Sequence, residues 1–164
     1  GAANRWTVID PGPDDDGHVR AVLAAAPGPI EAIVLTHSHK DHSPASRALS
    51  AATGAPVWGR WPAHPQGQDA QLALERELRH GERLACAPGA HLRVLHTPGH
   101  ASNHLCFLLE EEQLLFTGDH VMQSSTVVIN PPDGDMVAYL ASLRSLLDEG
   151  LEWLAPGHGF LMAQ

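Results

Sequence analysis

The stretch from Thr36 to His42, which reads THSHKDH, constrains this chain more than any other feature. It holds three imidazoles and one carboxylate within six positions. It directly follows the apolar residues 33–35, a run that is typical of the end of a buried strand. Nitrogen and oxygen donors at this density are typical of metal sites. The stretch therefore predicts a metal site on a loop at a strand end, with further ligands from later in the chain.

Three later residues are candidates for the missing ligands. His100, Asp119 and His158 each follow a short predicted strand and lie in a glycine-containing turn. Such strand-end turns can converge on one edge of a sheet. Within the first loop, His37 and His39 are two residues apart, so they can point the same way and share one ion.

The seven donors allow two adjoining sites with a shared carboxylate. One arrangement has His37, His39 and His100 at the first site, Asp41, His42 and His158 at the second, and Asp119 bridging them. Mixed imidazole and carboxylate ligands suit zinc, and also manganese or iron(II). Two close cations lower the pKa of a bridging water and polarise a substrate carbonyl or phosphoryl oxygen. The expected chemistry is hydrolysis by a metal-bridging hydroxide, with Asp41 also orienting the hydroxide or moving its proton.

Length and composition narrow the class of protein. The 164 residues suit one domain over 1–164, and 43% hydrophobic with 18% charged residues argues against disorder. A net charge of −9 disfavours a nonspecific nucleic-acid binder. No run approaches the ~18 apolar residues of a membrane span, and no signal peptide is visible. Cys86 and Cys106 do not form a C-x-x-C pair and indicate no disulfide framework, so we expect a reducing, cytoplasmic setting. We expect a small-molecule substrate and no membrane partner.

Apolar runs and Gly/Pro punctuation predict a mixed α/β chain. Strands are expected at 6–9, 30–35, 57–58, 83–86, 92–96, 104–109, 114–117 and 151–154. Helices are expected at 18–26, at 44–53 with Ser43 as N-cap, and at 136–149 with Asp135 as N-cap. The last helix has an expected apolar face of Met136, Tyr139, Leu140, Leu143, Leu146 and Leu147. Residues 59–71 read as a surface loop, and 72–78 as a short helix or an irregular segment.

With these motifs together, the chain resembles the metallo-β-lactamase superfamily of binuclear hydrolases. The H-x-H-x-D-H motif of that superfamily matches residues 37–42, and three further motifs match 97–100, 118–119 and 156–159 in the same order. The turn Asp10-Pro11-Gly12 also matches a family feature. The resemblance implies an αββα four-layer sandwich with the metals at one edge of its two sheets.

Departures from the family pattern refine this expectation. Zinc β-lactamases of the best-known subclass carry a cysteine where this chain has Asp119, so antibiotic hydrolysis is expected to be secondary at best. Family members usually have strands before the one at Trp6 and a helical segment at the C-terminus. We therefore expect a sandwich lacking some N-terminal strands and the C-terminal segment. Residues 126–139 look most like the lactamase-beta-like group, which includes endoribonucleases.

The leading hypothesis is a binuclear zinc hydrolase that acts on an ester, thioester, amide-like or phosphodiester bond. One alternative is a lactamase-beta-like endoribonuclease on single-stranded RNA. Another is a mononuclear iron oxidoreductase similar to the sulfur dioxygenases of the superfamily. A non-enzymatic member is disfavoured because the ligand set is complete. The sequence leaves the substrate, the metal and the oligomeric state open.

Several polar residues outside the ligand set have two interpretations. His104 is either a partner of a ligand or substrate, or a satisfied buried histidine, and Asp10 either accepts a ligand's ring N–H or only shapes a turn. His120 is expected to be structural, and Ser38 and Lys40 to shape the ligand loop. No site role is expected for His18, His64, His80, His91 and His96. Trp58, Trp61 and the loop 59–71 either line a substrate cleft or form an ordinary surface.

Overall fold

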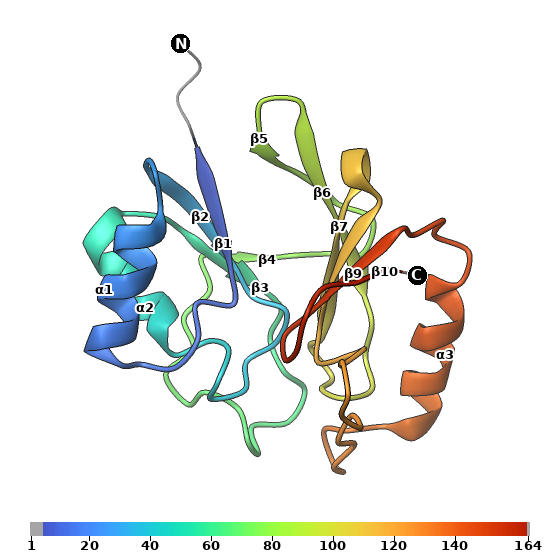
Figure 1. Ribbon diagram of the computed structural model, residues 1–164. Helices are drawn as coiled ribbons and strands as arrows, with labels where there is room; N and C mark the ends of the chain where they lie inside the picture. Colours follow the sequence, from blue (N-terminus) through green and yellow to red (C-terminus); the bar gives the residue numbers. More distant parts are fainter. Residues whose placement is uncertain (1–4, 164) are drawn as a thin grey trace.

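The computed structural model describes residues 5–163, which form two β-sheets stacked face to face with helices on both outer faces (Figure 1). Helices α1 and α2 cover the first sheet, and α3 covers the second. The four-layer αββα arrangement implied by the family resemblance is therefore confirmed.

The first sheet comes from the N-terminal half of the chain. Its strands pair in parallel in the order β1 (Trp6–Ile9), β2 (Ile30–Val34), β3 (Val57–Gly59) and β4 (Arg76–Glu77). Helices α1 (Asp16–Ala25) and α2 (Ala45–Thr53) connect its first three strands. Because helices cover one face and the second sheet covers the other, β2 is an almost continuous apolar run.

The second sheet is mixed. Its spatial order is β10 (Met162–Ala163), β9 (Trp153–Pro156), β8 (Leu114–Gly118), β7 (Leu105–Leu109), β6 (Ala90–His96) and β5 (Arg83–Ala87). Only the β8–β9 pair is parallel among these described strands. Helix α3 (Met136–Leu146) makes the crossover between them, and the 3-10 turn η1 (Glu110–Glu112) joins β7 to β8.

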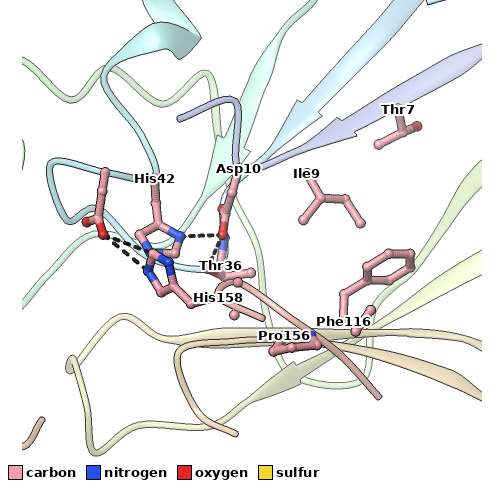
Figure 2. A pocket seen from close by; sticks show the side chains of 12 residues that line it. Thr7, Ile9, Asp10, Thr36, His42, Phe116, Pro156 and His158 are labelled. Atoms are coloured by element: carbon pink, nitrogen blue, oxygen red, sulfur yellow. Dashed lines mark hydrogen bonds and ion pairs between the residues drawn. The ribbon is translucent and has the colours of Figure 1, made fainter. Parts of the chain in front are cut away.

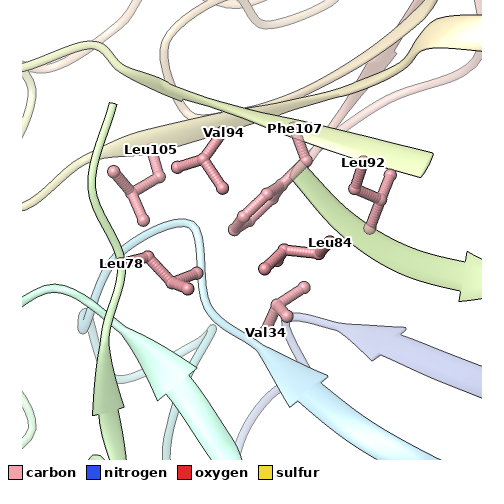
Figure 3. Close-up of a cluster of buried hydrophobic side chains, with 7 residues drawn as sticks. All are labelled: Val34, Leu78, Leu84, Leu92, Val94, Leu105 and Phe107. Carbon is pink, nitrogen blue, oxygen red and sulfur yellow. The ribbon is translucent and has the colours of Figure 1, made fainter. Parts of the chain in front are cut away.

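The core between the two sheets is centred on Phe107, whose side chain is fully buried. The cluster consists of Val34, Leu78, Leu84, Leu92, Val94, Leu105 and Phe107 (Figure 3). A second cluster lies between the first sheet and its helices, and a third places Leu146 of α3 against the second sheet. These three layers of burial hold the sheets at a fixed separation, so loops from both sheets can share one edge.

Local expectations fail where tertiary contacts decide the structure. The segment 72–78, expected as a short helix or irregular, contains strand β4, which pairs with Trp58 and Gly59. A two-residue strand is too short to show a periodicity. Ser43 does not cap α2: Pro44 occupies the N-cap position without a side-chain cap, and the hydroxyl of Ser43 lies 3.2 Å from Asp69 Oδ2. Strand β10 was also not predicted.

Helix α3 begins as expected but buries only part of its expected apolar face. The Asp135 carboxylate accepts the backbone N–H groups of Val137 and Ala138, which confirms it as the N-cap. Met136, Leu140 and Leu147, expected in the apolar face, are exposed by 53%, 43% and 75%. Leu146 is buried as expected, and Ser142, which was not in the expected face, also turns inward and donates its Oγ–H to the carbonyl of Pro98. Gly99 permits this approach, because a Cβ there would lie 2.3 Å from Tyr139 Cα.

Strand direction explains why the candidate ligands share one edge. Strands β1 and β2 run parallel in the first sheet. In the second sheet, β6, β8 and β9 also share one direction, because β6 and β8 are both antiparallel to β7. The segments that follow these five strands meet at the same end of the sandwich (Figure 1). Within residues 5–163, no helix is long and apolar enough to cross a membrane.

The central role of Phe107 can be tested by truncation. Phe107→Ala should lower the free energy of unfolding by about 3–5 kcal/mol, because it removes a buried ring and leaves a cavity. Urea denaturation followed by circular dichroism measures this change. The same substitution at Phe160, which is 79% exposed, should cost less than about 0.5 kcal/mol. Equal losses for the two variants would contradict the assignment of the core.

Candidate metal centre

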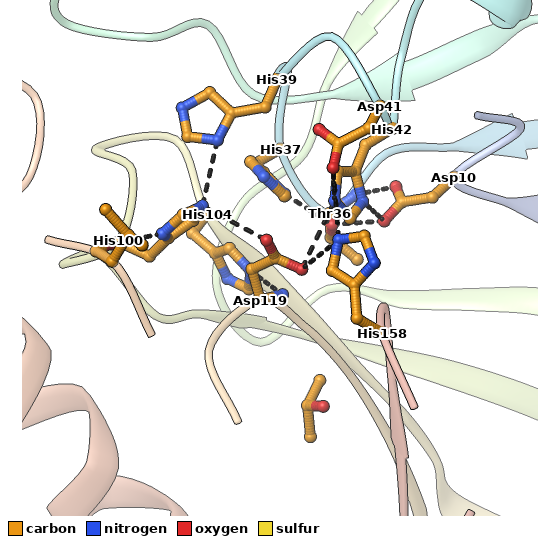
Figure 4. A network of polar contacts seen from close by, with 12 residues as sticks. Asp10, Thr36, His37, His39, Asp41, His42, His100, His104, Asp119 and His158 are labelled. Atoms are coloured by element: carbon orange, nitrogen blue, oxygen red, sulfur yellow. Dashed lines mark hydrogen bonds and ion pairs between the residues drawn. The ribbon is translucent and has the colours of Figure 1, made fainter. Parts of the chain in front are cut away.

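All seven candidate ligands lie together at the shared edge of the sheets (Figure 4). Four of them come from the loop after β2, and the others from the segments after β6, β8 and β9: His37, His39, Asp41, His42, His100, Asp119 and His158. The first group consists of His37, His39 and His100, whose ligand atoms lie within 4.8 Å of one another. His39 Nδ1 and His100 Nε2 are 3.0 Å apart. This group is largely enclosed, since His37 and His100 are buried.

The second group consists of Asp41, His42 and His158, again with ligand atoms within 4.8 Å of one another. Asp41 Oδ2 lies 3.2 Å from His158 Nε2 and 3.7 Å from His42 Nε2. The side chains of Asp41 and His158 are 58% and 45% exposed, so this group opens toward solvent.

Asp119 lies between the two groups. Its Oδ1 is 3.4 Å from His42 Nε2 and 3.5 Å from His158 Nε2, whereas its Oδ2 is 3.6 Å from His100 Nε2. One carboxylate therefore faces both groups through different oxygens, which is the geometry expected of a bridging ligand.

Hydrogen bonds on the far side of the rings fix which nitrogen faces the centre. Asp10 Oδ2 lies 2.8 Å from His42 Nδ1, and it also accepts the hydroxyl of Thr36 at 2.5 Å. Because that hydroxyl donates to Asp10, its oxygen accepts from His37 Nδ1 at 2.9 Å. His100 Nδ1 donates to the carbonyl of Val128 at 2.7 Å. In all three rings the Nδ1–H is used outside the centre, so Nε2 is the nitrogen that faces it.

Asp10 is therefore a partner of the ligand loop, in line with the first of its two interpretations. Its Oδ1 also accepts the backbone N–H of Thr36, so its oxygens serve three donors. Although Asp10 lies close enough to His37 and His42 to form a third possible metal group, these hydrogen bonds already occupy it. Thr36 was not singled out from the sequence, because a threonine that orients both an aspartate and a histidine has no spacing signature.

The residues present fit a pair of divalent cations. Three buried atoms that point into the centre, His37 Nε2, His42 Nε2 and Asp119 Oδ1, have no hydrogen-bond partner among the described residues. Leaving such atoms unpaired costs about 1–3 kcal/mol each, and a cation satisfies them together. The donors are imidazole nitrogens and carboxylate oxygens, which suit zinc, iron or manganese.

Burial and neighbouring charges shift the pKa values of these ligands. Burial, helped by nearby imidazoles, lowers the pKa of His37 well below its ordinary value. Burial also lowers that of His42, but the carboxylates of Asp10 and Asp119 outweigh it and raise the pKa to about 10. For Asp119, burial is opposed by His42, and the net effect lowers its pKa. A metal held by His42 would therefore have to displace a proton from it, which would couple metal affinity to pH.

Two buried histidines lie directly behind the centre. His104 Nδ1 lies 2.9 Å from Thr97 Oγ1, and its Nε2 accepts the backbone N–H of Asp119 at 3.2 Å. It thus holds the turn that carries the bridging carboxylate. His120 is also fully buried, but neither ring nitrogen has a partner among the described residues. Its ring packs on Tyr139 at a centroid distance of 4.9 Å, in line with the expected structural role.

A chain of polar contacts joins the ligand loop to two other loops. Ser38 Oγ donates to Gln68 Oε1 at 2.6 Å, and Gln68 Nε2 donates to Asp133 Oδ2 at 2.8 Å. Asp133 also accepts the backbone N–H and the hydroxyl of Ser102. Asn103 Nδ2 donates to Ser38 Oγ at 2.8 Å. Ser38 therefore shapes the loop as expected, whereas Gln68 and Asn103 could not be foreseen because their partners are distant in sequence.

Two cavities adjoin the centre. The inter-sheet cleft, of about 450 Å³, runs from His42 and His158 between the sheets toward Ile9 and Phe116 (Figure 2). The mouth groove, of about 540 Å³, opens on the other side and is lined by His39, Lys40, Asp41, Gln66, Gly67, His100, Asp119, Val128, Asn130, Pro131, Pro132 and Asp133. Trp58 and Trp61 line neither cavity, although Gln66 and Gly67 of their loop line the groove.

Comparison with known proteins identifies the family. A model of the metallo-β-lactamase superfamily matches residues 2–158, so the chain belongs to that superfamily. The solved structure of TTHA1623 in a di-iron-bound form is 30% identical, with a TM-score of 0.79 over 94% of this chain and 82% of that chain. The BLEG-1 B3 metallo-β-lactamase shares the fold with a TM-score of 0.80 at 24% identity, over 98% of this chain and 84% of that chain.

Fungal relatives carry names that bear on the reaction. Thioesterase pkgB of Emericella nidulans is 38% identical over 130 residues, which are 79% of this chain and 34% of that protein. The atrochrysone carboxyl ACP thioesterase of Aspergillus chevalieri is 34% identical over 148 residues, 88% of this chain and 44% of that protein. The lactamase-like protein vrtG of Penicillium aethiopicum is 37% identical over 131 residues, 79% of this chain and 39% of that protein. The chain spans less than half the length of each of these relatives.

The role of Asp10 predicts a metal-affinity defect. Asp10→Asn should weaken metal binding about 10- to 100-fold, because an amide NH₂ cannot accept from both His42 Nδ1 and the Thr36 hydroxyl. Competition with a chromogenic chelator measures the affinity. Asp14→Asn, the same change in a carboxylate that only pairs with Arg47 on the surface, should leave the affinity unaltered. A wild-type affinity for Asp10→Asn would refute the role assigned to this carboxylate.

The pKa shifts predict that the metal-free protein is most stable near pH 6.5. Below this pH the unfolded chain binds protons at His37 and His104 that the folded chain, with its lowered pKa values, does not. Each group then costs about 1.4 kcal/mol per pH unit. The raised pKa of His42 contributes stability that is complete below about pH 6.5 and is lost as pH rises toward about 10.

Urea denaturation of chelator-treated protein between pH 5 and 9 tests this profile. His42→Asn should flatten the alkaline decline while keeping the acidic one. A wild-type profile that rises steadily across this range would contradict the assigned shifts.

Proposed function

We propose that this protein is a binuclear zinc hydrolase that cleaves thioesters. The observation that carries the proposal is the pair of ligand groups that face one carboxylate, Asp119, through its two oxygens. His37, His39 and His100 would hold one ion, and Asp41, His42 and His158 the other. When bound, the two cations supply a hydroxide nucleophile at neutral pH and polarise the scissile carbonyl.

Residues of the chain would position the ligands, orient the attacking water and take up its proton. Asp10, Thr36 and His104 hold the ligands and the Asp119 turn in place, so that little reorganisation is needed during the reaction. Asp41, exposed at the mouth, is positioned to orient the attacking water and to take its proton. The oxygen of water bonds to the acyl carbon, the carbon–sulfur bond breaks, and the proton passes to the thiolate leaving group.

The choice of a thioester rests on the names of two fungal relatives, both thioesterases. Ester, amide-like and phosphodiester bonds suit the same ligand arrangement and belong in the same substrate panel. RNA is a weaker candidate because six arginines, which could otherwise bind phosphates, pair with carboxylates of the chain: Arg5, Arg47, Arg60, Arg76, Arg83 and Arg93.

The identity of the metal is a separate part of the proposal. Zinc suits the mixed donor set, but the 30%-identical TTHA1623 has a di-iron-bound form. Metal analysis of the purified protein distinguishes two zinc ions from two iron ions. A single iron per chain would instead favour the oxidoreductase alternative.

Removal of one ligand tests the proposal. His39→Ala should lower kcat/KM for an acyl N-acetylcysteamine thioester at least about 100-fold and reduce the bound metal below two ions per chain. Thiol release measured with a chromogenic disulfide gives the rate, and elemental analysis gives the metal content. Asp119→Ala should behave in the same way. His64→Ala, the same change at an exposed loop histidine, serves as the control.

Wild-type turnover by the His39→Ala or Asp119→Ala variant would refute the role of the centre. If the metal-loaded protein cleaves another bond in the panel but no thioester, the proposed bond is wrong while the hydrolytic centre stands.

A further inference from the structure

Lys40 is the one lysine of this chain, and it lies in the ligand loop between His39 and Asp41. Its side chain is exposed and lines the mouth groove, whose wall also includes His100 and Asp119. Because neighbouring Cα atoms are about 3.8 Å apart, the ammonium group is tethered one residue from two candidate metal ligands. A group bound by Lys40 would therefore lie close to the reacting bond.

The ammonium group of Lys40 has no partner within the described part of the chain. No carboxylate of residues 5–163 lies within 4.0 Å of it, and it makes no hydrogen bond there. Ser38, two residues earlier, is by contrast held by Gln68 and Asn103. The expectation that Lys40 shapes the loop therefore has no side-chain contact to support it, and Lys40 is left as an exposed residue of the groove wall.

The three carboxylates that line the groove have partners or proposed roles other than pairing with Lys40. Asp133 is buried and accepts hydrogen bonds from Gln68 and Ser102. Asp41 and Asp119 belong to the proposed metal centre, where cations would neutralise them. In a chain with a net charge of −9, Lys40 is thus left as a cation in a groove of about 540 Å³ next to the centre.

We propose that Lys40 binds a carboxylate on the acyl part of the substrate, so that the enzyme prefers thioesters of dicarboxylic acids or other acidic acyl groups. This inference rests on the proposed thioesterase function and names its substrate class. Because Lys40 is exposed, dissolved salt should screen such an ion pair and weaken it as ionic strength rises. The side-chain amides of Gln66 and Asn130, which also line the groove, would offer hydrogen bonds to the bound carboxylate.

A matched pair of substrates tests the preference. The glutaryl thioester of N-acetylcysteamine and its terminal carboxamide differ only in charge. The wild-type protein should favour the carboxylate about tenfold in kcat/KM, and this preference should shrink as salt is raised. Lys40→Met should abolish the preference, Lys40→Glu should reverse it, and Lys40→Arg should keep it. Arg20→Met removes the same charge from the exposed surface of α1 and should keep the preference.

A second measurement does not depend on turnover. Because the chain has one lysine, labelling with ¹³C-lysine gives one ε-methylene signal in the zinc-loaded protein. A thioether analogue of the glutaryl substrate should shift this signal in a saturable way, and its carboxamide counterpart should not. Lack of a carboxylate-specific shift would overturn the inference, as would a carboxylate preference that survives Lys40→Met.

The two proposals fail in different ways. Thioester hydrolysis without a charge preference and without a shift would refute the role of Lys40 and leave the thioesterase function intact. A carboxylate-specific shift without hydrolysis of any thioester would support the role of Lys40 and refute the thioesterase function.

Discussion

The structure depends most on how the lone pairs of buried ligands are directed toward one another. His37, His42 and Asp119 each bring a buried, unpartnered atom to the same point between the sheets. Such an arrangement is unfavourable without a cation or a proton, because these atoms are shielded from water. The hydrogen bonds behind the rings nevertheless enforce it. A bound metal ion would therefore stabilise the folded chain in addition to any catalytic role, because it would satisfy atoms that the fold leaves unpaired.

Asp10 is the link between this electrostatic arrangement and the fold. It stands directly after β1, and it accepts both from Thr36 after β2 and from His42 in the ligand loop. The parallel pairing of β1 with β2 brings these segments together, and the core around Phe107 fixes the distance to the second sheet. His104 plays the matching part in the second sheet by accepting the N–H of Asp119. Both halves of the centre are thus oriented by groups that would not themselves contact a metal.

Much of the fold and of the candidate site could be predicted from the sequence. The predictions that were confirmed rest on local patterns, whereas those that were wrong depend on tertiary contacts. The THSHKDH loop and the turns at His100, Asp119 and His158 predicted a shared site because strand ends with polar turns are a local pattern. The structure brings these seven residues together, while their roles as ligands remain a prediction. Asp135 as an N-cap succeeded for the same reason, since capping depends on near neighbours. The predictions for residues 72–78 and for three exposed positions of α3 were wrong, because pairing with Trp58 and the close approach at Gly99 decide these parts of the structure.

The two metal-ligand groups are not equivalent, and this asymmetry suggests how substrates approach. The group of His37, His39 and His100 is enclosed, whereas Asp41 and His158 are the exposed members of the other. Lys40 lies between a partly buried candidate ligand, His39, and an exposed one, Asp41, on the wall of the groove. An acidic acyl group held there would bring its carbonyl to the exposed side, where a bound cation would have room for another oxygen ligand. The loop of residues 36–42 would then supply four of the metal ligands and also select the substrate.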